Sequence, residues 1–224
     1  MGSPSELGAV QPLTELLGPL VAAYRGDEEQ ASRIAQGIEA RAARQGAGPI
    51  EAWARYVRAE VLLDSDPERA ADLLDGAIEL ALAQGDRYAS GVAMVSAASV
   101  RGRHGDPQLA VPLYREVIDH WSSVGDWTHQ WTSLRGVVDV LMRLGCHEHA
   151  AILRGGLTNR AQAAPIYGPD AERMAAAETL LRQHLGDDLF VELTERGARM
   201  PDDAVVSFAR SALAPTTLPT QRRR

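Results

Sequence analysis

Glycine recurs along this chain at a spacing of about 20 residues, and this regularity limits the possible folds more than any other feature. Aspartate follows most of these glycines. Glycine often ends a helix in the left-handed conformation, and aspartate caps the free N–H groups of the next helix. The pattern therefore predicts a succession of helices joined by short turns. The glycines are Gly26, Gly46, Gly85, Gly105, Gly125 and Gly145, and the aspartates are Asp27, Asp66, Asp86, Asp106 and Asp126.

Alternate turns match better than adjacent ones, which indicates a repeating unit of two helices and about 40 residues. Segment 66–86 aligns with segment 106–126 without a gap. A small residue early in each second helix is expected to let its partner helix cross closely, and these residues are Ala31, Ala70, Ala110 and Ala150. The expected pairs span about 7–46, 47–86, 87–126 and 127–163. An all-α fold follows, a right-handed α-solenoid of about four antiparallel helix pairs.

The period ends near the C-terminus, at Gly155-Gly156 and at segment 164–170. Three further helices are expected to begin at Asp170, at Asp187 and at Pro201-Asp202, and the second should end near Gly197. A solenoid needs a terminal cap with one polar face, and this segment suits that role. The expected organisation is a disordered leader at 1–6, repeats at 7–163, capping helices at 164–213 and a disordered tail at 214–224.

The composition excludes several classes of function. The formal net charge is −7, which disfavours direct binding to nucleic acid. The chain has no lysine, which excludes a phosphate-binding P-loop and Schiff-base chemistry because both need a lysine side chain. The single cysteine, Cys146, cannot form an internal disulfide, and no signal peptide or membrane-length apolar run occurs. We therefore expect a soluble cytoplasmic protein without a membrane partner.

The sequence contains no constellation typical of catalysis, so a non-enzyme without a cofactor is expected. Cys146-His147-Glu148-His149 is the cluster with metal-type ligands, but it lacks a second half and occupies a turn between helices. It is therefore interpreted as a polar helix start, and no metal is expected. Asp187-Asp188 and Asp202-Asp203 fall at helix starts, where negative charge is favourable.

Two tryptophans, Trp127 and Trp131, lie four positions apart directly after Gly125-Asp126. This spacing places both on one face of a helix. Together with Trp121 they are expected to form one aromatic cluster between repeats. A ligand-stacking role for Trp127 and Trp131 is the alternative interpretation.

Each of the second helices at 66–86 and 106–126 places a small residue, a large apolar residue and a second small or apolar residue at matching positions. These residues are Ala70, Leu74 and Ala77, and then Ala110, Tyr114 and Val117. With the turn glycines Gly105 and Gly145, this arrangement resembles the tetratricopeptide repeat, although the unit here is longer than the 34 or so residues of that family. The resemblance implies stacked helix pairs that bind a partner in a groove.

A second resemblance covers about 85–213. The residues that carry it are Trp121, Gly125, Trp127, Trp131, Leu134, Arg135, Leu144, Gly145, Ala150-Ala151 and Asp202-Asp203-Ala204-Val205. This segment is similar to the C-terminal region of actinobacterial signal-transducing NTPase regulators. In these, an ATPase module precedes helical repeats, and some branches carry a LuxR-type or SARP-type DNA-binding domain or a nucleotide-cyclase domain. The resemblance implies a sensor or interaction region that restrains the motor domain, present here as an excised tail or as a free-standing relative.

By register with the tetratricopeptide family, a groove is expected on the first helices of the pairs. Its lining residues would be Arg55, Ser99, Arg103, Arg135, Asp139 and Arg143. Guanidinium groups bind carboxylates and phosphates through forked hydrogen bonds, so the partner would be a protein, a peptide or a small anionic effector. A solvated arginine face is the alternative, and a homodimer is compatible with the sequence.

Three functions remain open at this point. The first is a non-catalytic sensor or interaction module of a transcriptional or signalling regulator. The second is a free-standing scaffold or adaptor unrelated to transcription, and the third is an enzyme accessory or ligand-binding protein.

Overall fold

The computed structural model describes residues 15–24, 27–158, 160, 163 and 168–214. Within these residues every regular element is a helix and no strand occurs. The segments predicted to be disordered, 1–6 and 214–224, lie outside the described residues apart from Ala214. None of the described helices is both long enough and apolar enough to cross a membrane.

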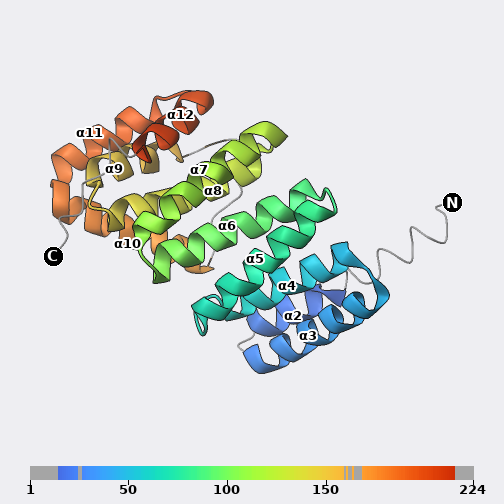
Figure 1. Cartoon of the computed structure of the whole chain (residues 1–224). Coiled ribbons are helices and arrows are strands. Elements are labelled where there is room, and N and C mark those ends of the chain that lie inside the picture. The colour runs from blue at the N-terminus through green and yellow to red at the C-terminus, as the bar shows by residue number, and fades with distance from the viewer. Residues whose placement is uncertain (1–14, 25–26, 159, 161–162, 164–167, 215–224) are drawn as a thin grey trace. The chain divides into compact units, whose positions relative to one another are not determined.

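The chain divides into two compact units, residues 1–100 and 101–224. The first unit contains α2 (Leu17–Tyr24), α3 (Glu28–Gln45), α4 (Gly48–Leu62), α5 (Pro67–Ala83) and most of α6 (Arg87–His104). The second contains the end of α6, then α7 (Pro107–Val124), α8 (Trp127–Arg143), α9 (His147–Gly156), α10 (Gly168–Leu185), α11 (Asp187–Ala198) and α12 (Asp202–Ala212). Figure 1 shows these helices in order along the chain.

Most helices that follow one another in sequence pack against one another within each unit. In the first unit α3 contacts α2 and α4, and α4 contacts α5 (Figure 1). In the second unit α8 contacts α7 and α9. The observed helices follow the predicted pair boundaries, which confirms an all-α helical repeat.

The turns between helices are built as the sequence predicts. The carboxylates of five aspartates accept hydrogen bonds from backbone N–H groups two or three residues later, at Gln30, Arg69, Ala89, Gln108 and His129. Gly46, Gly85, Gly125 and Gly145 have φ between 66° and 76°, the region where glycine is favoured. Gly105 is the exception, because it does not have a positive φ. Local capping therefore sets where most helices begin and end.

The small residue predicted early in each second helix is buried in all four pairs. Ala31, Ala70, Ala110 and Ala150 each have 0% exposure. A larger side chain at these positions would meet neighbouring atoms on every side, because such interiors are close-packed.

The largest fully buried side chains of the described residues lie mostly in the second unit. In the first unit, Leu74 lies among buried alanines of α4, α5 and α6, such as Ala59, Ala77 and Ala93. The second unit buries Tyr114, Ile118, Trp121, Trp131, Leu134, Leu141, Leu153, Leu181 and Leu213. Its core is therefore built from bulkier groups than that of the first unit.

The C-terminal helices pack on α7, α8 and α9, and they begin and end close to the predicted positions. Gly155 and Gly156 are buried residues at the end of α9. Gly197 is the last residue but one of α11, as the prediction of a helix end near it requires. A Cβ on Gly197 would lie 1.8 Å from the carbonyl oxygen of Ile152, and one on Gly155 would lie 2.0 Å from that of Thr194. These glycines let α9 and α11 touch through their backbones, a contact that a local sequence pattern does not reveal.

Candidate functional site

The predicted groove residues fall in both units. Arg55 and Ser99 lie in the first unit, and Arg103, Arg135, Asp139 and Arg143 lie in the second. Arg55 on α4 is held by two carboxylates. Its Nε donates to Glu39 Oε1 at 3.1 Å, and its Nη2 donates to Glu51 Oε1 at 2.7 Å. Glu39 also pairs with Arg58. Arg55 therefore joins α3 to α4 through a partly buried ion-pair network, and its charge is balanced inside the first unit.

Ser99 is the other predicted residue of the first unit. It lies on α6 and is half-buried. One turn earlier, Ser96 Oγ donates to Glu60 Oε1 of α4 at 2.5 Å. The serines of α6 thus lie on a helix that is packed against α4.

Arg143, at the end of α8, ties that helix to the end of α6. Its Nη1 donates to the carbonyl oxygen of Arg103 at 3.0 Å and also to that of Gly102. Carbonyl groups at a helix C-terminus carry partial negative charge, so a guanidinium group is favourable there. Arg143 therefore has a structural role at this helix end, whatever else its exposed side chain binds.

Asp139 on α8 lies in the field of two arginines, Arg103 of α6 and Arg173 of α10. Burial raises the pKa of Asp139 above its ordinary value, and the two positive charges lower it by less than burial raises it. Arg173 was missed by the sequence analysis, because the pattern of α10 gave no sign that it faces α8.

Arg135 lies one helical turn before Asp139 and is half-buried. Burial lowers the pKa of its guanidinium group. We call Arg103, Arg135, Asp139 and Arg173 the α8 cluster. Arg103 and Arg173 act on the carboxylate of Asp139 from α6 and α10, and Arg135 lies beside it on α8. Such a cluster favours carboxylate or phosphate groups.

The three tryptophans of the predicted aromatic cluster make ring contacts in the second unit. Trp127 and Trp131 do form a pair, with ring centroids 5.4 Å apart, and Arg160 lies over the Trp131 ring at 5.5 Å. Trp121 stacks on His129 at 4.6 Å and meets His120 edge-on at 4.9 Å, and it lines the same pocket as Trp127. The sequence analysis did not foresee the contacts of Trp121 with His120 and His129.

Asp126 connects this aromatic region to the helix start. Its Oδ1 accepts from the backbone N–H of His129 at 3.0 Å, and its Oδ2 lies 2.8 Å from His129 Nδ1. Burial by itself would raise the pKa of Asp126, but these hydrogen bonds and the charge of His129 outweigh burial and leave the pKa below its ordinary value.

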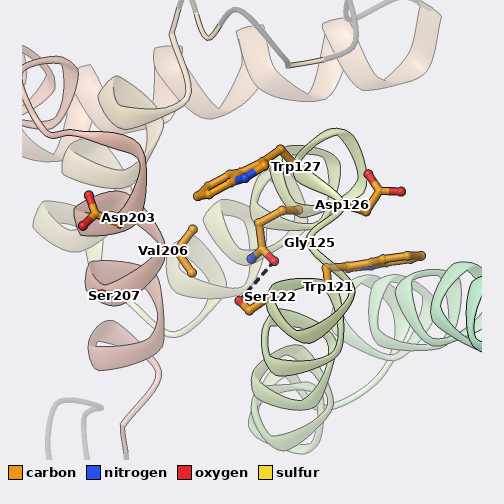
Figure 2. Close-up of a pocket in the computed structure, with 9 residues that line it drawn as sticks. Trp121, Ser122, Gly125, Asp126, Trp127, Asp203, Val206 and Ser207 are labelled. Atoms are coloured by element: carbon orange, nitrogen blue, oxygen red, sulfur yellow. Dashed lines mark hydrogen bonds between the residues drawn. The ribbon is translucent and has the colours of Figure 1, made fainter.

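A pocket of about 230 Å³ opens beside this region, entirely within the second unit. Figure 2 shows Trp127 and Asp126 on one side and Asp203, Val206 and Ser207 of α12 on the other. Ser122, Gly125, Trp121 and Gln130 complete its lining. Of the predicted aromatic pair, Trp127 lines the pocket, whereas Trp131 is 1% exposed and does not.

The cluster at 146–149 is arranged as part of the packing. The His147 ring stacks on His184 of α10 at 4.0 Å, and the His149 ring stacks on Phe208 of α12 at 5.8 Å. Burial, together with the charge of His184, lowers the pKa of His147, and burial raises the pKa of the Cys146 thiol. Among the described residues no group of three histidine, cysteine or acidic side chains has the arrangement of a metal site.

Comparison with known proteins assigns no family: no protein-family model matches the chain, and no curated protein matches it.

Proposed function

We propose that this chain is a non-catalytic, tetratricopeptide-like sensor or protein-interaction module of a bacterial transcriptional or signalling regulator. It binds a partner protein, a peptide or a small effector through acidic groups of that partner. The repeated helix pairs and the resemblance of segment 85–213 to signal-transducing NTPase regulators support the type of module.

The α8 cluster is the observation that carries the binding part of this proposal. Arg103 and Arg173 act on the carboxylate of Asp139, and Arg135 lies one helical turn before it on α8. Arg55, at the equivalent repeat position in the first unit, is already matched by Glu39 and Glu51. We place the partner's carboxylate or phosphate groups at the α8 cluster because several guanidinium groups lie near one another there, and forked hydrogen bonds from such groups suit these anions.

A hexaglutamate peptide is a suitable probe of the α8 cluster. Binding measured by calorimetry should weaken about three- to tenfold in Arg135→Ala, because one charge-assisted hydrogen bond is lost. Arg33→Ala is the matched control, since Arg33 is exposed on α3 and lies 3.9 Å from Glu29. The Arg33→Ala variant should bind the peptide with the affinity of the wild type, and added salt should weaken binding by both proteins. Equal affinity in Arg135→Ala and wild type would contradict the proposed site.

The regulatory part of the proposal is tested separately, in the genome. An ATPase-coding segment in the same reading frame, immediately upstream, is expected. A stop codon directly upstream of this chain would instead favour the free-standing scaffold.

A further inference from the structure

The pocket between α12 and the turn from α7 to α8 contains a buried polar group whose hydrogen bonds are incomplete. Gln130 lines the pocket and is only 2% exposed. Its Oε1 accepts from Ser122 Oγ at 3.5 Å, the contact drawn as a dashed line in Figure 2. Its Nε2 is fully buried and has no hydrogen-bond partner in the described structure.

A buried amide N–H without an acceptor is unfavourable, and the great majority of buried polar groups in folded proteins have partners. Gln130 occupies the same helical stripe as Leu134, Val137 and Leu141, which are buried apolar residues. Packing alone would favour an apolar residue at this position. A glutamine there is explained if its amide donates to something that enters the pocket.

The walls of the pocket are mainly apolar and flat. The Trp127 indole is half-buried, and Figure 2 shows it reaching from α8 toward Val206 on α12. An aromatic face opposite a branched aliphatic side chain suits a planar molecule. The volume of about 230 Å³ suits a small ligand and not a folded partner.

The charged residues of the lining are both acidic. Asp126 is already engaged by His129, and Asp203 is exposed and accepts from the backbone N–H of Ala204 at 2.9 Å. Two carboxylates at the edge disfavour an anion. The pocket therefore differs in ligand preference from the α8 cluster.

From these observations we infer that the pocket binds a small, flat, uncharged molecule with a carbonyl oxygen. The carbonyl accepts from Gln130 Nε2, and the planar body lies between Trp127 and Val206. This inference does not depend on the proposed function, because none of these residues belongs to the α8 cluster.

Three probes of similar shape separate the contributions of the hydrogen bond, the apolar packing and the ligand's charge. These are 2-quinolone, which has a carbonyl, naphthalene, which has no acceptor, and 2-naphthoate, which is an anion. Ligand-observed NMR titration of the full chain should give 2-quinolone the highest affinity, about three- to tenfold above naphthalene, because it makes one additional hydrogen bond. The anion should bind most weakly. Equal affinity for all three, or no binding at all, would overturn the inference.

Two variants place the binding at this pocket. Gln130→Leu should remove the preference for 2-quinolone over naphthalene while retaining naphthalene binding. Ser207→Trp should abolish binding of both neutral probes by filling the pocket, and since Ser207 is exposed this variant is expected to fold. Unchanged 2-quinolone affinity in folded Ser207→Trp would place the binding elsewhere and overturn the inference.

Discussion

Arg55 in the first unit and Arg135 in the second hold equivalent repeat positions, yet their electrostatic surroundings differ. Arg55 is hydrogen-bonded to Glu39 and Glu51. Arg135 belongs to the α8 cluster, and burial lowers the pKa of its guanidinium group. The comparison teaches that repeat register predicts where an arginine lies on its helix. Which charged groups lie near that arginine depends on the helices packed beside it.

Gly76 of the first unit and Gly197 of the second differ in what an added Cβ would meet. A Cβ on Gly76 of α5 would lie 2.7 Å from Arg55 Nη1, at the far end of a flexible side chain. A Cβ on Gly197 would instead meet the backbone of α9. The first contact can adjust by moving a side chain, whereas the second requires two helices to separate.

The largest effect is expected from Gly197→Ala. The added Cβ would lie 1.8 Å from the carbonyl oxygen of Ile152, so α9 and α11 must move apart, at a cost of about 3 kcal/mol in unfolding free energy. Urea unfolding measures the loss.

Gly37→Ala on α3 is the control for this substitution. Gly37 is exposed, and a Cβ there has no atom within 4 Å. Alanine should then stabilise the protein by up to about 1 kcal/mol through its helix propensity. Equal stability of the two variants would show that the close contact between α9 and α11 does not hold in solution.

A medium effect should distinguish the two equivalent arginines. Arg55→Ala leaves Glu51 without this partner in a partly buried site and should lower the unfolding free energy by about 2 kcal/mol. Arg135→Ala should lower it by less than about 1 kcal/mol, because burial already disfavours that charge. Thermal unfolding of the two variants under identical conditions provides the comparison. A larger loss in Arg135→Ala than in Arg55→Ala would reverse our assignment of structural and binding roles.

The smallest effects concern how stability depends on pH. Two aspartates are involved, Asp126 in the turn between α7 and α8 and Asp139 on α8. The pKa of Asp126 is lowered on folding, so its ionised form stabilises the protein above the unfolded pKa, and this contribution is lost as pH falls through the folded pKa. The pKa of Asp139 is raised, so its ionised form is unfavourable above the folded pKa, and that penalty disappears as pH falls.

Asparagine at each position tests the direction of the pKa shift, because it removes the charge with little change in shape. Between about pH 6 and about pH 3, the stability advantage of wild type over Asp126→Asn should shrink. Over the same range, the stability of wild type relative to Asp139→Asn should grow. Urea midpoints at the two pH values measure both differences, and parallel trends in the two variants would be inconsistent with opposite pKa shifts.

The sequence by itself determined the helices, their order and most of their ends. Asp126 caps α8 and Gly125 adopts a positive φ because capping involves residues only a few positions apart. The burial of Ala31 and its counterparts could likewise be predicted, since it follows from the period of the repeat. These features are local or periodic, so a single sequence contains the information.

Tertiary structure alone decided which side chains meet across helices. Gln130 could have been noticed as a polar residue on an apolar stripe, but its pocket forms only because α12 brings Val206 and Asp203 beside α8. The roles of Gly197 and Arg173 likewise depend on helices far away in sequence, α9 and α8. The physical reason is that helix capping depends on neighbouring residues, whereas charge balance, close backbone contact and pocket shape depend on how separate helices pack.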